Sequence, residues 1–385
     1  MTEKQQKIRR LGMEASYLAC CAIHDQVPET APENLDELYT FCKFHSITAM
    51  VTMALEKIWK TNPADAVQMQ RWRQARDMAI RKNMLLNAER QRICNYLESI
   101  GCWYMPLKGS FLQFDYPKFG MRQMSDNDIL YDEEKTQEVH DFLTGDGYEV
   151  ENYLRGNHDE YVKKPVYNME MHRSLFVKFV NPVLAEYYKD IKNKLIKDAG
   201  NSYGYHFSPE DFYVFMAAHG YKHYMNGGVG VRTLLDAYVF LEKYSELLDW
   251  KYIEKELRSI DAWEYDTECR GLAAKLFSAP SVQVELSAEE LEALDMYFAA
   301  GSYGTEAQKV QNKLDTLSQN GRSSGKLRYV LVRMFPSFEL MKERYRILKK
   351  HPWLAPVCYV LRLFSVLFRR KEIARELQNL EKAKK

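Results

Sequence analysis

The sequence predicts an α+β protein in which a short strand-rich segment lies within a mostly helical chain. Apolar residues recur at helical spacing in the first hundred residues and again after about residue 206. Between these parts, residues 102–176 contain short apolar or alternating stretches separated by Gly and Pro, which is typical of strands and turns. We therefore expect an N-terminal helical region, a central core and a C-terminal helical region, at residues 1–62, 63–206 and 207–385.

The composition is that of a folded protein without a strong charge preference. The chain has 385 residues, of which 46% are hydrophobic and 28% are charged, and its formal net charge is +1. Such a balance gives no long-range attraction for nucleic acid, so we expect no specific nucleic-acid partner. The seven scattered cysteines include no CxxC pair, which indicates reduced thiols and a cytoplasmic protein. The N-terminus also lacks the apolar stretch of a secretory signal.

The N-terminal region is expected to be helical. Asn34 and Glu37 have the spacing of a capping box, and apolar residues follow at helical intervals. A long helix is expected next, with Asn62 as its N-cap and Pro63 in its first position. Gly101 is expected to end it.

The central core is expected to contain the strands. Short apolar or alternating segments predict strands at 102–109, 124–132, 148–153 and on both sides of Pro165, with helices at 110–116 and 133–148. Helices are expected again from Ser208, which precedes Pro209 in a helix-start pattern, and then at 250–259, 263–278 and 286–299. Residues 317–325 have the composition of a linker.

Lys108, Gly109 and Ser110 follow the first expected strand directly. Gly109 permits a tight turn that presents backbone amides to an anion, while Lys108 adds a positive charge and Ser110 a hydroxyl. Taken alone, the three residues fit a phosphate cradle, and they also fit an ordinary strand-to-helix turn.

Three acidic residues lie on the following expected strands. Asp126 and Asp128 are two residues apart, so a strand would place both on one face, where they repel each other unless a cation lies between them. Carboxylate oxygens suit Mg²⁺ or Mn²⁺. Glu170, on a later strand beside His172, can supply a third carboxylate. A solvated acidic turn and an outward-facing strand residue remain the alternatives.

His219 and His223 are four residues apart and therefore share one helical face. Gly220 stands where a zinc hydrolase would have Glu, so that motif is not met. The pair fits either partly buried helix histidines or, together with Arg232 and Asp236, the lining of a substrate cleft.

The apolar residues from Val357 to Phe368 follow helical spacing and precede a basic tail, residues 369–385. The pattern fits a helix that packs on a core, and it also fits weak contact with a membrane surface, since basic amphipathic helices bind anionic lipid.

The order of these features resembles the nucleotidyltransferase superfamily typified by DNA polymerase β. The closer resemblance is to a bacterial nucleotidyltransferase-like family with an LKG…R…SDxDxL signature, which reads LKGSFLQFDYPKFGMRQMSDNDILY here. It continues through GDGYEV, VYNMEMHRSL and, more weakly, HGYKHYMNGGVGVRTLLDAYVFL. The similarity covers roughly residues 40–245. Asn127 departs from it, because that position is usually apolar, and this suggests a more open strand.

The resemblance implies a polymerase β-like core with a small mixed sheet and a nucleotide-binding site. Lys108, Gly109 and Ser110 would contact the β- and γ-phosphates, and Arg122 would neutralise phosphate charge. Asp126, Asp128 and Glu170 would bind the divalent metal ions and carry the catalysis, with Mg²⁺ or Mn²⁺ as the cofactor. Nearby cleft residues would be His172, His219, His223, Arg232 and Asp236.

The implied activity is metal-dependent transfer of a nucleoside monophosphate from an NTP, with release of pyrophosphate. The acceptor would be an unidentified hydroxyl or phosphate, for example in surface-polysaccharide biosynthesis. The alternatives are a non-catalytic nucleotide-binding or interaction protein and an enzyme of toxin–antitoxin type that nucleotidylates protein or RNA.

Overall fold

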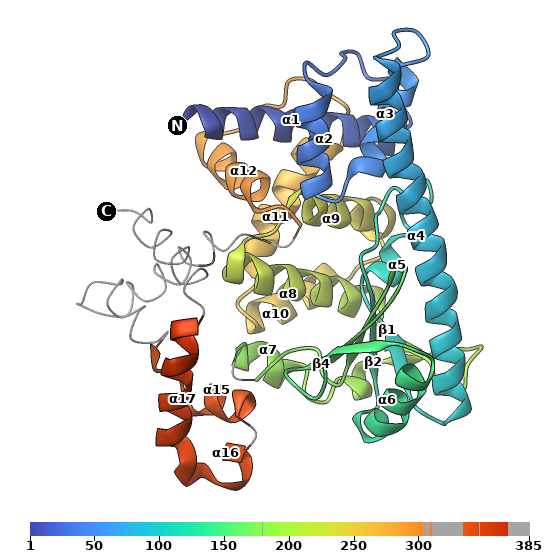
Figure 1. Cartoon of the computed structure of the whole chain (residues 1–385). Coiled ribbons are helices and arrows are strands. Elements are labelled where there is room, and N and C mark those ends of the chain that lie inside the picture. The colour runs from blue at the N-terminus through green and yellow to red at the C-terminus, as the bar shows by residue number, and fades with distance from the viewer. Residues whose placement is uncertain (179, 303, 305–308, 310–333, 346, 369–385) are drawn as a thin grey trace.

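The computed structural model describes residues 1–178, 180–302, 304, 309, 334–345 and 347–368 (Figure 1). The expected linker at residues 317–325 and the basic tail at residues 369–385 lie outside these described residues. The seven cysteines are free and buried, as expected.

Helices form most of the described chain, as predicted. The N-terminal helices are α1 (Glu3–Ile23), α2 (Leu35–Phe44), α3 (Thr48–Ile58) and α4 (Ala66–Ser99). The central helices are α5 (Gly109–Leu112), α6 (Thr136–Gly145) and α7 (Pro182–Tyr187). The later helices are α8 (Pro209–Gly227), α9 (Val231–Tyr244), α10 (Trp250–Ser259), α11 (Trp263–Phe277), α12 (Ala288–Ala300), α15 (Phe338–Arg344), α16 (Ile347–Lys350) and α17 (Ala355–Phe368).

The start of the long helix α4 differs from the prediction. Asp65, and not Asn62, is the N-cap, because its side chain accepts hydrogen bonds from the amides of Val67 and Gln68. The Asn62 amide donates to the Ile58 carbonyl, so Asn62 belongs to the turn that follows α3. The predicted end is confirmed, since Gly101 has a φ of +66° directly after the last turn.

Helices from both ends of the chain share one hydrophobic core. Leu18 of α1 and Met50 of α3 belong to the same buried cluster as Leu235 of α9, Phe277 of α11 and Phe298 of α12. Figure 1 shows these helices stacked beside α4, above the sheet. The core therefore joins the first and third of the expected regions.

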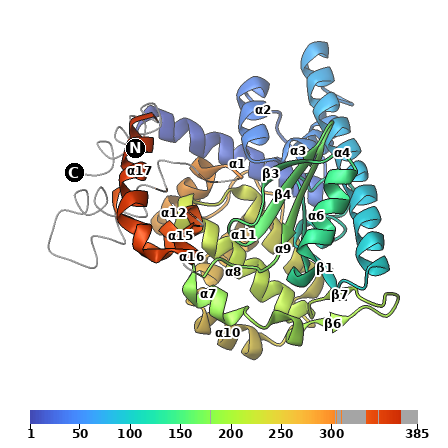
Figure 2. The same ribbon diagram turned by 60° about the horizontal axis from the view of Figure 1, so that its bottom comes forward.

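The predicted strands are present and form a small mixed sheet in the order β1-β2-β5-β4-β3 (Figure 2). The strands are β1 (Tyr104–Pro106), β2 (Asn127–Tyr131), β3 (Glu149–Asn152), β4 (His158–Lys163) and β5 (Tyr167–His172). Only the β2–β5 pair within this sheet is parallel. A separate two-stranded sheet pairs β6 (Ile196–Lys197) with β7 (Tyr205–His206).

The two faces of the sheet meet different helices. Ile129 and Met171 belong to a core that includes Ile93 of α4 and Leu143 of α6. On the opposite face, Leu130 belongs to a second core that α8 and α10 help to build. Because strand residues alternate between faces, the polar residues of β2 and β5 at Asp128, Glu170 and His172 lie on the α8 side, away from α4.

Asn127 does not open the strand, contrary to the expectation. It is fully buried, and its side-chain amide donates to the Leu86 carbonyl of α4 at 2.8 Å. The Arg90 guanidinium donates to its carbonyl oxygen at 3.3 Å. A polar residue therefore fits this position because α4 satisfies its hydrogen bonds.

The C-terminal helix α17 leaves part of its apolar stripe exposed. Val357, Val360 and Leu361 are each about half exposed, whereas Cys358 packs with Met341. These residues therefore do not pack on a core of the described chain, and contact with a membrane surface stays a prediction. Within the described part of the chain, no helix has both the length and the apolar character needed to span a membrane.

His45, which follows α2, links α9 and α12 within the shared core as a buried neutral group. Its Nε2 donates to the Phe298 carbonyl at 3.1 Å, and its Nδ1 accepts from the Val231 amide at 3.4 Å. Burial lowers the pKa of His45 from 6.5 to about 4, and the Arg232 charge adds to this against the opposing Phe298 carbonyl.

Because of His45, the free energy of unfolding is predicted to decrease as the pH falls. A histidine with a lowered folded-state pKa contributes fully above pH 6.5, and this contribution is lost as the pH falls toward 4. Each pH unit below the unfolded-state pKa corresponds to about 1.4 kcal/mol. Lowering the pH from 7 to 5 should therefore reduce the free energy of unfolding by about 2 kcal/mol. Urea unfolding of the wild type and of His45→Gln at both pH values measures the difference, and an identical pH dependence in the two proteins would contradict this account.

Candidate functional site

A cavity of about 340 Å³ lies between the sheet and helices α8 and α9. Every site residue predicted from the sequence, except Ser110, lines it. These residues are Lys108, Gly109, Arg122, Asp126, Asp128, Glu170, His172, His219, His223, Arg232 and Asp236. Residues more than a hundred positions apart are thus brought to one place.

The turn between β1 and α5 is held tightly against its surroundings. Lys108 has a φ of +39°, a backbone conformation that is strained for a residue with a Cβ. Gly109 has no room for a Cβ, which would lie 2.4 Å from Arg122 Nη1 and 2.8 Å from the Met124 sulfur. The Ser110 amide donates to the Leu107 carbonyl at 3.1 Å, while its buried hydroxyl has no partner among the described residues. A side chain at position 109 would therefore have to displace the end of the Arg122 or Met124 side chain.

The aspartates lie at the start of β2. Asp126 precedes the strand, and Asp128 is its second residue, directly opposite Glu170 of the parallel strand β5. One oxygen of Asp128 lies 2.8 Å from His172 Nε2, and the other lies 3.3 Å from Lys108 Nζ. The parallel β2–β5 pairing is what brings the third acidic residue beside the other two.

Asp126 and Asp128 differ in the direction of their pKa shifts, and their contacts explain the difference. Burial and the charges of Asp128 and Glu170 together raise the pKa of Asp126 to about 6, against the opposing charges of Lys108 and Arg232. Burial also opposes ionisation of Asp128, but Lys108 and the His172 hydrogen bond hold its pKa well below the usual range. Asp128 is therefore the firmly ionised carboxylate of the pair.

The donor atoms of this cavity fit a divalent cation. Asp126, Asp128 and Glu170 offer only oxygen ligands, as Mg²⁺ and Mn²⁺ prefer. Their mutual repulsion, which contributes to the raised pKa of Asp126, is what a bound cation relieves. Among the described residues, however, the three ligand atoms that already lie within 4.8 Å of one another belong to His158, Glu170 and His172.

Arg122 is paired within the protein instead of pointing free into the cavity. Its Nε and Nη2 donate to the two oxygens of Asp236 at 2.8 and 2.9 Å, and the Tyr116 hydroxyl donates to the same carboxylate at 2.7 Å. Arg122 and Asp236 are both buried, so removing one partner would leave an isolated buried charge. The pair anchors the segment around Gly109 to α9.

The segment between the turn and β2 is also fixed to α4. The side-chain amide of Asn83, which is fully buried, donates to the Arg122 carbonyl at 2.8 Å, and its oxygen accepts from the Met124 amide at 2.9 Å. Lys82 donates to the Ser125 carbonyl at 2.9 Å. The long helix α4 therefore fixes the position of the segment that leads to Asp126.

His219 and His223 face the cavity from one side of α8, as their spacing predicts. Their Nε2 atoms lie 3.1 Å apart. Burial, reinforced by the neighbouring lysines Lys108 and Lys222, lowers the pKa of His219 well below its usual value and that of His223 to about 3. Both imidazoles are therefore neutral near pH 7.

Sequence reasoning missed other residues of the cavity, among them His158, Glu160 and Lys222. His158 and Glu160 alternate on β4, but only the strand order places β4 next to β5. Lys222 lies three residues after His219 on the same helical face, a spacing that could have identified it. Burial and the nearby Lys108 lower the pKa of Lys222 to about 8, against the attraction of Asp128 and Glu170.

The close approach at Gly109 predicts a stability cost for any side chain there. In Gly109→Ala, the new methyl group must displace Arg122 or Met124, which costs about 1–3 kcal/mol of unfolding free energy. Gly271→Ala is the matched control, because an added Cβ meets nothing within 4 Å in the interior of α11 and should stabilise by up to about 1 kcal/mol. Denaturant unfolding compares the two variants, and equal stabilities would show that the turn has room.

A comparison with known families found one family that matches most of the chain. Residues 31–278 match the family described as "Uncharacterised nucleotidyltransferase", a span that includes every residue of the site. Comparisons with the curated proteins and with the solved structures gave no match. Because the matched residues make up well over half of the chain, this protein belongs to that nucleotidyltransferase family.

Proposed function

We propose that this protein is a metal-dependent nucleotidyltransferase that moves a nucleoside monophosphate from an NTP to an acceptor hydroxyl or phosphate and releases pyrophosphate. The observation that carries the proposal is the convergence of Asp126, Asp128 and Glu170 with the Lys108–Gly109 turn in one cavity. Membership of a nucleotidyltransferase family supports the same activity.

Each group at this site has a role that its position supports. Asp126, Asp128 and Glu170 would hold Mg²⁺ or Mn²⁺, which supplies charge neutralisation for the triphosphate and acidifies a bound hydroxyl. Lys108 reaches the cavity beside Asp128, and its ammonium is placed to attract phosphate oxygens. Gly109 leaves room for Arg122 and Met124 beside the turn, which keeps the turn at the wall of the cavity.

The groups from α8 and α9 complete the cavity on the side away from the sheet. Lys222 brings a second ammonium near Asp128 and Glu170. The neutral His219 and His223 can exchange hydrogen bonds with a substrate without repelling cationic neighbours. The Arg122–Asp236 pair acts indirectly, since it fixes the turn that carries Lys108.

Replacing both aspartates is predicted to abolish transfer while leaving the fold intact. In Asp126→Asn/Asp128→Asn the amides cannot replace two charged metal ligands, so transfer from labelled NTPs with Mg²⁺ should fall by about 1,000-fold or more. Pyrophosphate release should fall in parallel. Sugar phosphates, RNA and protein are offered as acceptors, which distinguishes polysaccharide-precursor chemistry from nucleotidylation of RNA or protein.

The matched control is Glu149→Gln/Glu151→Gln. It removes two carboxylates with the same spacing from the exposed strand β3, outside the cavity, and should leave transfer unchanged. Thermal unfolding checks that both double variants are folded. Transfer that persists at the wild-type rate in the aspartate variant would overturn the proposal.

A further inference from the structure

Five titratable side chains form two adjacent rows across strands β2, β5 and β4. In the first row Asp128 is opposite Glu170, and Glu170 is opposite Glu160. In the second row His172 is opposite His158. Like charges directly opposite each other destabilise a sheet, so the carboxylate row needs a positive group nearby.

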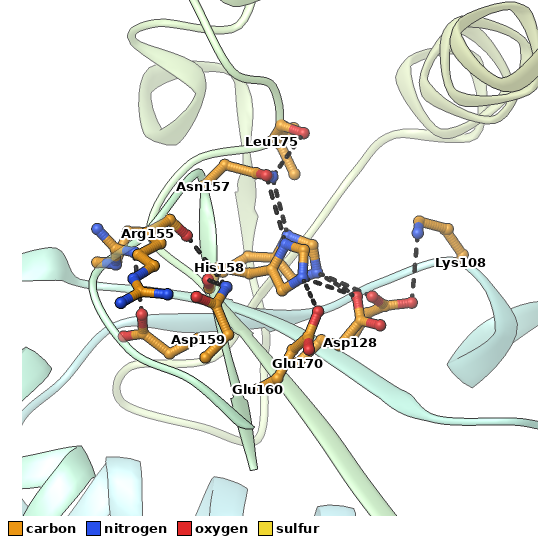
Figure 3. Close-up of polar contacts among 12 residues, drawn as sticks. Lys108, Asp128, Arg155, Asn157, His158, Asp159, Glu160, Glu170 and Leu175 are labelled. Atoms are coloured by element: carbon orange, nitrogen blue, oxygen red, sulfur yellow. Dashed lines mark hydrogen bonds and ion pairs between the residues drawn. The ribbon is translucent and has the colours of Figure 1, made fainter. Parts of the chain in front are cut away.

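The ring nitrogens of both histidines lie close to the carboxylates of the first row, and Figure 3 shows His158 beside Glu170. The Nε2 of His172 lies 2.8 Å from Asp128 and 3.5 Å from Glu170 Oε2. The Nε2 of His158 lies 3.0 Å from Glu160 and 3.7 Å from the same Glu170 oxygen. Both imidazoles therefore point at Glu170.

These separations fit a single metal ion. Donor atoms held about 2.1 Å from one ion are about 3.0–3.4 Å apart at right or tetrahedral angles and about 4.2 Å apart when opposite. The ligand atoms of His158, Glu170 and His172 lie within 4.8 Å of one another, and the two distances from Nε2 to Glu170 Oε2 are 3.5 and 3.7 Å. Small movements of these side chains would bring the two Glu170 distances into the range expected for a shared ion.

Asn157 contacts the Nδ1 atom of both rings, on the side away from the carboxylates. Its Oδ1 lies 3.3 Å from Nδ1 of His158, and its Nδ2 lies 3.4 Å from Nδ1 of His172. The same Nδ2 donates to the carbonyls of Ser174 and Leu175 at 3.0 and 3.2 Å, which holds the carboxamide in this direction. At His158 the Oδ1 contact can hold the proton on Nδ1, as the outer partners of metal-binding histidines do, and an ion at Nε2 would replace the contact with Glu160. At His172 an ion at Nε2 would replace the contact with Asp128, and the ring proton would move to Nδ1, which would break the contact with the Asn157 Nδ2.

We propose that His158, His172 and Glu170 bind a first-row transition-metal dication such as Zn²⁺, Co²⁺ or Mn²⁺ at a position distinct from the all-oxygen site of Asp126 and Asp128. Two imidazole nitrogens favour these ions over Mg²⁺, which prefers oxygen ligands. Glu170 belongs to both donor sets, so the two sites adjoin. The inference does not depend on nucleotidyl transfer, since it concerns binding of the metal alone.

Titration of the full chain with Co²⁺, without nucleotide, tests this site through the visible absorption of the bound ion. In millimolar Mg²⁺, which can fill the all-oxygen site, wild-type protein should retain one bound Co²⁺ ion. His158→Gln should weaken binding at least 10-fold, because it removes a ligand whose side chain is only partly buried and whose loss the fold tolerates. The matched control is His206→Ala, which removes an imidazole from a His–Asp pair on β7 and should bind as the wild type does.

The variant Asp126→Asn distinguishes the histidine site from the all-oxygen site of the proposed nucleotidyltransferase. Co²⁺ binding should persist within about 3-fold in that variant, because Asp126 is not among the three ligands. Zn²⁺ should also shift the side-chain ¹⁵N resonances of His158 and His172, which shows direct ligation. Unchanged Co²⁺ affinity in His158→Gln, displacement of all Co²⁺ by Mg²⁺, or loss of Co²⁺ in Asp126→Asn alone would each overturn the histidine site. None of these outcomes decides whether the protein transfers nucleotides.

Discussion

The structure around the cavity depends on one constraint, the repulsion among carboxylates that the sheet places side by side. Asp128, Glu170 and Glu160 are neighbours across three strands, and Asp126 lies just before the first of them. Burial strengthens that repulsion, because little water remains to screen it. The positive or proton-donating groups nearby, Lys108, Lys222 and His172, offset it in the absence of a cation. A divalent cation offsets it more completely, which is the physical basis of the proposed metal dependence.

The surrounding helices hold this arrangement in place from outside the sheet. Asn83 and Leu86 of α4 bind the segment that leads into β2, and Asp236 of α9 holds Arg122 against the turn at Gly109. His45 in turn joins the amide at the start of α9 to α12. The cavity therefore depends on helices that are far apart along the chain, of which the family match at residues 31–278 includes α4 and α9 but not α12.

Local patterns in the sequence, together with the family resemblance, were sufficient for most of the secondary structure and for most of the charged and histidine side chains that line the cavity. The alternation of Asn168, Glu170 and His172 predicted which side of β5 is polar, and the spacing of His219 and His223 predicted their shared face. Long-range pairing was not predictable. The Arg122–Asp236 ion pair links residues 114 positions apart, so no local pattern could show that the Arg122 charge is matched inside the protein. His158 and Glu160 were missed because their relevance depends on β4 lying next to β5. Asn62 was preferred to Asp65 as a cap because Asn62 precedes a proline, whereas the turn after α3 uses the Asn62 amide.

The most direct test of the central claim is a crystal structure with Mn²⁺ and a non-hydrolysable NTP analogue, in which anomalous scattering locates the metal. The account predicts a Mn²⁺ ion bound by Asp126, Asp128 and phosphate oxygens, with Glu170 adjacent and the triphosphate beside Lys108 and Gly109. A triphosphate bound away from this cavity, or the absence of any Mn²⁺ ion in contact with Asp126 or Asp128, would contradict it.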